Sequence, residues 1–306
     1  MKKVPHVPVL YREVLDLFAE LKSGTIVDCT LGYGGHSELL LNSNPDINII
    51  GIDQDIEAIE YSKTRLAKFG DRVKIINSRA SEALLDILDH GGDSICGILA
   101  DIGVSSLQLD QNQRGFSYSS DSLDMRMDQT RTLSAKDVVN SYTQGDLERV
   151  LKEYGEIRNY KKVAQAILEH RDFDSALALS EVVKPYAPYG KKIHPATLVM
   201  QAIRIEVNDE LGELKRVLET LQHSRLDLRV AIISFHSLED RIVKQTFASW
   251  AKSCICSSEA MRCECGGNNA IGTMVQKRPF TAKDDELKAN IRSRSAKLRA
   301  FDLRST

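Results

Sequence analysis

The sequence predicts an α/β fold, in which a parallel sheet covered by helices is interrupted by an inserted all-helical domain. Short apolar and β-branched runs alternate with segments of helical spacing through roughly the first hundred residues, which is the pattern of a parallel sheet. The alternation stops after Asp101, and the next strand-like run begins only at Arg229. The long segment between these two residues carries apolar residues at helical spacing, so we expect a separate helical domain there.

Six runs are expected to form the strands of the sheet. They are Thr25–Thr30, Ile47–Asp53, Val73–Asn77, Ile95–Ile102, Arg229–Phe235 and Ala296–Leu303. Helical spacing at Ile56–Phe69 and Ser81–Leu88 supplies crossover segments of the kind that parallel strands need. After the fifth run, Ser237 with Asp240 three residues later is typical of a helix N-cap.

The inserted domain is expected over residues 111–213, and the sheet domain is then discontinuous, over 1–110 and 214–306. Leu147, Val150, Leu151 and Tyr154 fall at positions i, i+3, i+4 and i+7, which is one face of a helix. A similar apolar stripe begins at Leu211, close to the expected end of the insert.

Composition excludes several classes of protein. The chain has 306 residues, of which 42% are apolar and 27% charged, so collagen-like and disordered chains are excluded. A net charge of −2 argues against a protein that coats nucleic acid through bulk charge. The sequence shows neither a long uncharged apolar run nor the apolar core of a signal peptide, so we expect a cytoplasmic protein that does not engage a membrane.

A glycine-rich turn follows the first expected strand, with an acid ahead of it at Asp28. Glycines at Gly32, Gly34 and Gly35 permit a tight turn and the close approach of a ligand to the backbone. Asp53 ends the second strand 21 residues after Gly32, at the spacing where a carboxylate accepts hydrogen bonds from ribose hydroxyls. The sequence therefore predicts a nucleoside site, and the alternative is a turn that only joins strand to helix.

The pattern of this turn narrows the choice of nucleoside. The third glycine of a dinucleotide fingerprint is missing, which disfavours an oxidoreductase that uses NAD, and no lysine follows the turn as a P-loop would require. Asp28 followed by Gly32 and Gly34 resembles the first motif of S-adenosylmethionine-dependent methyltransferases, with Thr30 where a glycine is common.

Asp101 ends the fourth strand, and ligands in such sheets lie outside the carboxyl ends of the strands. The amino group of a nucleobase is a poor nucleophile because its lone pair is delocalised into the ring. A carboxylate that accepts hydrogen bonds from that amino group favours the pyramidal nitrogen that attacks a methyl group. Asp101 is therefore our candidate catalytic residue, and the alternative is that it orders the turn at Gly103.

Four of the six cysteines crowd into the pairs Cys254-x-Cys256 and Cys263-x-Cys265. Four thiolates could hold a tetrahedral zinc ion, but zinc ribbons favour two intervening residues, and the alternative is reduced thiols in a hairpin. From the sequence alone we assign no metal ligand. Cys29 and Cys96 lie in apolar runs and are expected to be inert.

Several longer motifs occur together in this chain. They are Gly32-Tyr33-Gly34-Gly35-His36-Ser37, Asp101-Ile102-Gly103-Val104-Ser105-Ser106, Arg114-Gly115-Phe116-Ser117, Leu123-Asp124-Met125-Arg126-Met127-Asp128, His194-Pro195-Ala196-Thr197 and Ser234-Phe235-His236-Ser237-Leu238-Glu239-Asp240-Arg241. With them the chain resembles, over nearly its whole length, the RsmH (MraW) family of bacterial 16S ribosomal RNA cytosine-N4 methyltransferases.

The resemblance implies a Rossmann-like class I methyltransferase sheet with the helical domain 111–213 recognising substrate. It implies S-adenosyl-L-methionine as the methyl donor and a decoding-region cytosine of 16S ribosomal RNA, or of the small ribosomal subunit, as the acceptor. It leaves open whether the chain acts as a homodimer. The residues implied to contact the donor are Gly34, Gly35, His36, Asp53, Ala80, Asp101 and Gln108. Many relatives have an aromatic residue where this chain has Ala80, which offers no ring to stack on the adenine from that side.

Other features concern the RNA. The Pro-Pro-aromatic sequence usual after the strand-four acid is replaced by Ile102-Gly103-Val104, so we expect Phe116 or Tyr118 to stack on the extruded cytosine. Basic residues in the segments 184–204, which include Lys191 and Lys192, and 277–306 are expected to contact phosphates. The competing interpretations are a noncatalytic RNA-binding assembly factor and an amino-methyltransferase that acts on another nucleic acid.

Overall fold

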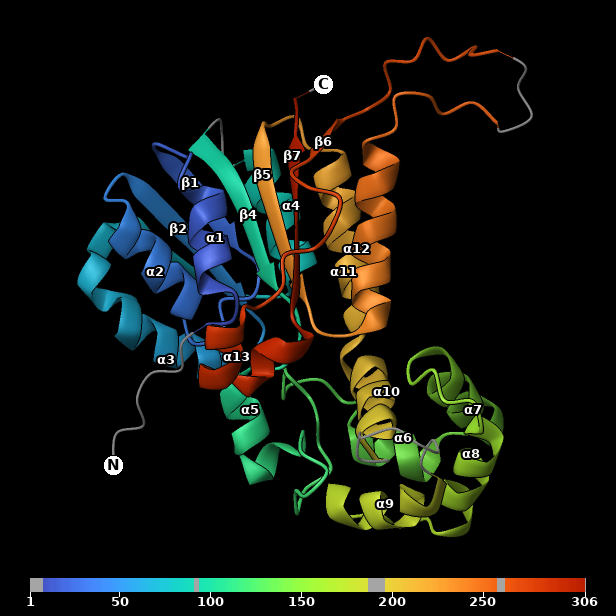
Figure 1. Ribbon diagram of the computed structural model, residues 1–306. Helices are drawn as coiled ribbons and strands as arrows, with labels where there is room; N and C mark the ends of the chain where they lie inside the picture. The colour runs from blue at the N-terminus through green and yellow to red at the C-terminus, as the bar shows by residue number, and fades with distance from the viewer. Residues whose placement is uncertain (1–7, 91–93, 187–195, 258–261, 306) are drawn as a thin grey trace. The chain divides into compact units, whose positions relative to one another are not determined.

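The computed structural model describes residues 8–90, 94–186, 196–257 and 262–305, and it divides into two compact units (Figure 1). Unit 1 comprises residues 1–103 and 212–306, and unit 2 comprises residues 104–211. The limits expected from the sequence, 110/111 and 213/214, lie slightly further along the chain. Among helices in the described ranges, none has both the length and the apolar character needed to cross a bilayer.

Unit 1 is built on a seven-stranded sheet in the order β3-β2-β1-β4-β5-β7-β6. The strands are β1 (Gly24–Asp28), β2 (Ile47–Asp53), β3 (Val73–Asn77), β4 (Ile95–Asp101), β5 (Leu228–Ser234), β6 (Gly272–Met274) and β7 (Lys297–Leu303). Neighbours from β3 through β5 pair in parallel, and β7 is antiparallel to both of its neighbours. The α/β prediction and its six strands are confirmed; β1 ends two residues and β4 one residue earlier than expected, and β6 was not expected.

Two apolar layers cover the two faces of this sheet. Ile26 of β1 faces a cluster that includes Val14 and Leu17, whereas Val27, the next residue of the strand, faces a cluster that includes Leu84 and Phe247. This alternation is expected for strands that are buried on both faces. Because helices cover both faces of the sheet, polar side chains can gather only at the ends of the strands.

The helical segments expected at Ile56–Phe69 and Ser81–Leu88 are two of the helices of unit 1, and the first of them ends at Leu66. The helices of unit 1 are α1 (Tyr11–Phe18), α2 (Gly35–Ser43), α3 (Ile56–Leu66), α4 (Ala80–His90), α12 (Ser237–Trp250) and α13 (Asp284–Ala289), with α11 (Glu210–Gln222) beginning in unit 2. The expected N-cap at Ser237 is wrong by one residue. His236 caps α12, and Glu239 completes a capping box by accepting a hydrogen bond from the His236 amide.

The described residues of unit 2 form helices around one apolar core, as the sequence predicts. The helices are α5 (Ser106–Asp110), α6 (Ala135–Ser141), α7 (Gln144–Glu153), α8 (Tyr160–Glu169), α9 (Ala176–Val183) and α10 (Ala196–Asn208). The stripe Leu147, Val150 and Leu151 is fully buried in that core. Side chains of Ser134, Thr143 and Ser175 cap three of the helices, which explains where they begin.

Candidate active site

The glycine turn between β1 and α2 has the backbone that its sequence predicts. Gly32 and Gly34 have φ values of 51° and 72°, in the left-handed region that favours glycine. A Cβ added to Gly35 would lie 2.7 Å from Cγ of Pro8, so this position also excludes a side chain. At Gly32 the nearest described atom to such a Cβ is the Thr30 carbonyl oxygen, at 3.8 Å, so that side of the turn is not crowded.

Asp53 ties the end of β2 to this turn. Its Oδ2 accepts a hydrogen bond from the Gly32 amide, and its Oδ1 accepts one from the Asp55 amide, each at 2.8 Å. Burial raises the pKa of Asp53 to about 6, against the opposing effect of these two amides. Each carboxylate oxygen keeps a lone pair for a further donor, so the carboxylate can accept hydrogen bonds from a vicinal diol.

Asp101 lies at the same edge of the sheet, because β1 pairs with both β2 and β4 in parallel. Its side chain is 26% exposed, and among the described residues its Oδ1 has no hydrogen-bond partner. The imidazole of His36, which is 7% exposed, places Nε2 3.6 Å from Asp101 Oδ2. Neither ring nitrogen of His36 has a hydrogen-bond partner in the described part of the chain. Buried polar atoms without partners mark a place where a ligand is expected to bind.

Thr30 positions Asp101, a role that we did not predict from the sequence. The ladder between β1 and β4 ends at the pair Asp28 and Leu99. Beyond it, the Asp101 amide donates to the Thr30 hydroxyl, and the N···O distance is 2.6 Å. The signal in the sequence was that Thr30 stands where a glycine is common, because only a side chain with an oxygen can make this bond.

Asp28 stabilises the turn through hydrogen bonds within the protein. It is buried, and its carboxylate accepts hydrogen bonds from the Ser37 hydroxyl at 2.6 Å and from the Thr30 amide at 3.3 Å. Burial raises the pKa of Asp28, and the Ser37 hydroxyl opposes that shift. With both oxygens engaged inside the protein, Asp28 shapes the turn, and Asp53 and Asp101 offer the free acceptor positions.

The structure brings together five of the seven residues implied to contact the donor: Gly34, Gly35, His36, Asp53 and Asp101. Ala80 is the first residue of α4, after β3, and is half-buried. Gln108 belongs to unit 2, where its Oε1 accepts a hydrogen bond from the Ser105 amide at 2.9 Å. A contact of the donor with Ala80 or with Gln108 stays a prediction.

The two aromatic candidates for base stacking differ in exposure. Phe116 is 6% exposed and packs in the core of unit 2, so it is not available as a stacking surface. Its motif has a structural role there, because buried Arg114 donates to the carbonyl oxygens of Arg126 and Met127. Tyr118 is 43% exposed and stays a candidate.

The basic segments are only partly available to bind phosphate. Lys184 pairs with Glu181, and Lys191, Lys192 and the motif residues His194 and Pro195 lie outside the described residues. In the C-terminal segment, Lys297 and Arg299 both pair with Asp240, at 2.9 and 2.7 Å. The exposed basic residues of that segment are Lys277, Arg278, Lys283, Lys288, Arg294 and Arg304.

The sheet and its turn define the class of protein. A seven-stranded sheet in this order with β7 reversed, a glycine turn after β1 and an acid ending β2 are the features of a class I methyltransferase. The acids that end β2 and β4 lie at one edge of that sheet, as a site for a nucleoside-containing donor requires.

The chain belongs to the MraW methylase family, whose model matches residues 3–304. It is similar to proteins named ribosomal RNA small subunit methyltransferase H. The one from Sulfurimonas denitrificans is 56% identical over 99% of this chain and 100% of that protein. Those from Nitratiruptor sp. and Wolinella succinogenes are 58% and 53% identical, each over 98% of this chain and 99% of the relative.

Proposed function

We propose that this methyltransferase transfers a methyl group from S-adenosyl-L-methionine to N4 of a cytosine in the decoding region of 16S ribosomal RNA in the small ribosomal subunit. The names of the relatives support the small-subunit RNA as substrate. The observation that carries the proposal is the carboxylate of Asp101, whose Oδ1 has no partner among the described residues and lies at the same sheet edge as Asp53.

The residues at this edge fit the donor. Asp53 supplies acceptors for the two ribose hydroxyls, and the turn at Gly32 lets the ligand approach the backbone. His36 offers ring nitrogens that no described residue engages. When bound, the donor supplies a methyl group attached to a cationic sulfur, and this sulfur leaves as part of a neutral thioether.

Asp101 prepares the acceptor nitrogen. Its Oδ1 accepts a hydrogen bond from the exocyclic amino group, which favours the pyramidal geometry in which the lone pair points at the methyl carbon. The nitrogen lone pair forms the new N–C bond while the electrons of the S–C bond return to sulfur. The nitrogen then releases one proton, to Asp101 or to water. Most of the acceleration comes from proximity and orientation, which Thr30 maintains by holding Asp101 in place.

The cytosine must leave its stack to reach this site, as enzymes acting on a base require. We assign recognition of the RNA to unit 2 and to the exposed basic residues of the segment 277–304. Phosphate contacts of this kind weaken as salt rises, so RNA affinity should fall with ionic strength. Exposed Tyr118 is the aromatic residue of the motif region that can offer a face to a base.

The test is transfer of labelled methyl groups to small ribosomal subunits that lack the modification, followed by nucleoside mass spectrometry. We expect N4-methylcytidine in 16S RNA, and Asp101→Asn should lower kcat by about a hundredfold or more while donor affinity changes little. Asp46→Asn is the matched control, because Asp46 is exposed and lies just before β2, at the opposite end of that strand.

Three outcomes would contradict the proposal. Methylation of another nucleic acid in preference to small subunits would make the chain an amino-methyltransferase with a different substrate. RNA binding without methyl transfer would make it an assembly factor. Equal activity of Asp101→Asn and Asp46→Asn would remove Asp101 from the catalytic role.

A further inference from the structure

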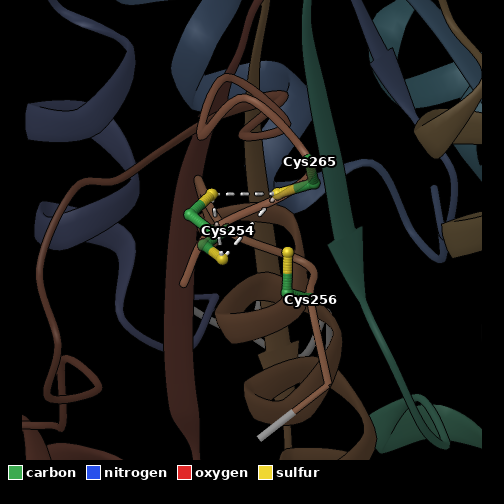
Figure 2. A group of neighbouring side chains, drawn as sticks. Cys254, Cys256 and Cys265 are labelled. Carbon is green, nitrogen blue, oxygen red and sulfur yellow. Dashed lines mark hydrogen bonds between the residues drawn. The ribbon is translucent and has the colours of Figure 1, made fainter. Parts of the chain in front are cut away.

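Four cysteine side chains converge in the loop between α12 and β6, in unit 1. Cys254, Cys256, Cys263 and Cys265 place their sulfur atoms within 4.8 Å of one another. Figure 2 shows the labelled Cys254, Cys256 and Cys265 side chains directed toward a common point. The two Cys-x-Cys pairs thus meet across the loop. Their separation in the sequence does not by itself bring them together.

Three of the four sulfur atoms have the spacing of a tetrahedral metal site, and Cys256 Sγ lies within 4.8 Å of each of them. The Sγ···Sγ distances are 3.6 Å for Cys254–Cys263, 3.6 Å for Cys263–Cys265 and 3.7 Å for Cys254–Cys265. A tetrahedron of thiolates about 2.3 Å from a zinc ion has edges of about 3.8 Å. A disulfide would bring two sulfurs to about 2.0 Å, so none of these contacts is one. The short spacer is no obstacle in the second pair, because Cys263 and Cys265 already reach this separation.

Each Cys-x-Cys pair donates a backbone amide hydrogen bond to a sulfur of the other pair. The Ile255 amide donates to Cys265 Sγ at 3.4 Å, and the Glu264 amide donates to Cys256 Sγ at 3.2 Å. Each donor is the middle residue of one pair, and each acceptor is the second cysteine of the other. Hydrogen bonds of this kind orient ligand atoms and stabilise the negative charge of thiolates that bind a metal.

Apolar packing does not explain the convergence. None of the described residues between 251 and 271 is buried, and Ile255 is 64% exposed. The loop is closed at its base by hydrogen bonds, in which the Ile271 amide donates to the Trp250 carbonyl and the Asn269 amide to the Ser253 carbonyl. A small polar loop without a core is the setting in which metal binding supplies the free energy of folding.

We infer that Cys254, Cys256, Cys263 and Cys265 bind one Zn²⁺ ion in a tetrahedral site that orders this loop. Four protein thiolates fill the coordination sphere and leave no position for water or substrate, so the site is structural. Soft thiolates in a tetrahedral set select zinc or iron among the common metals. An iron–sulfur cluster inserts several irons and sulfides between its ligands, which needs more space than these sulfurs enclose.

The first test is the metal content of protein purified without chelator from zinc-supplemented cells. We expect about one equivalent of zinc per chain, with Cys256→Ser and Cys263→Ser each reducing it to a small fraction. Cys96→Ser is the control, because Cys96 lies in β4 outside the cluster, and it should retain the zinc. After zinc removal, Co²⁺ should produce the intense visible bands and thiolate charge-transfer absorption of a tetrahedral cobalt–thiolate site.

A second measurement tests the order of the loop by its resistance to trypsin. Lys252 and Arg262 are exposed trypsin sites in the described part of the loop. Trypsin should cleave after them faster in Cys256→Ser and in chelator-treated protein than in the zinc-loaded protein. These readouts do not depend on methyl transfer, so they stand whether or not the proposed function holds.

Four results would overturn the inference. They are no zinc in the wild-type protein, zinc retained by both cluster variants, iron in place of zinc, and loss of the four thiols to disulfides in protein unfolded without reductant.

Discussion

Replacing Thr30 with valine should separate the orientation of Asp101 from the binding of the donor. Valine matches the shape of threonine but cannot accept the hydrogen bond that the Asp101 amide donates at 2.6 Å. A fully buried amide left without a partner costs about 1–3 kcal/mol, and because this bond is part-buried we expect a penalty of about 1 kcal/mol. If that penalty is expressed in the transition state, kcat/KM falls by about 5-fold.

The assay is steady-state methyl transfer to small ribosomal subunits, with donor affinity measured separately by calorimetry. We expect the loss in kcat, with little change in the KM for the donor, because Thr30 acts through Asp101. Thr30→Ser keeps the hydroxyl and should retain most of the activity. Thr30 does not position Asp101 if Thr30→Val is as active as the wild type, or if Thr30→Ser is impaired to the same extent as Thr30→Val.

Two further predictions concern titrating carboxylates. The pKa of Asp53 is about 6 in the folded protein, so donor affinity should rise with pH through that value as the carboxylate ionises. Calorimetry should show that the donor affinity of Asp53→Asn does not change over the same pH range. If the donor affinity of the wild type does not rise either, Asp53 does not bind the ribose. Lys297 and Arg299 hold the pKa of Asp240 below its usual range, so the stability that Asp240 contributes is present above about pH 4 and is lost as pH falls through its folded-state pKa. Asp240→Asn should therefore lower Tm at pH 7 and lose its effect in strong acid; an equal Tm difference at both pH values would show that the ion pairs are not the cause.

Much of the sheet could be predicted because its strands are buried on both faces. Such strands appear as continuous apolar runs, and β2 begins and ends at the expected residues. The edge strand β3 also begins and ends as expected, although none of its residues is fully buried. The edge strand β6 has only three residues and forms by pairing with β7, so no local pattern marks it. The N-cap at His236 was missed because a histidine is an unusual capping residue and the neighbouring serine is a common one.

In the site, too, local sequence patterns predicted some features, whereas features that depend on tertiary packing were not predicted. Spacing alone linked Gly32 to Asp53, and the structure joins them by a hydrogen bond. The bond from the Asp101 amide to Thr30 depends on where β1 stops, which the apolar run did not reveal. The burial of Phe116 depends on the packing of unit 2, so its place in a motif suggested a role in stacking that the structure does not support.

The most direct measurement is a crystal structure of the protein with a non-reactive analogue of S-adenosylmethionine. We expect ribose hydroxyls within hydrogen-bond distance of Asp53, and the carbon or nitrogen that replaces the transferable methyl group beside Asp101. An analogue bound away from the carboxyl ends of β1, β2 and β4, or a reactive position remote from Asp101, would rule out the proposed site.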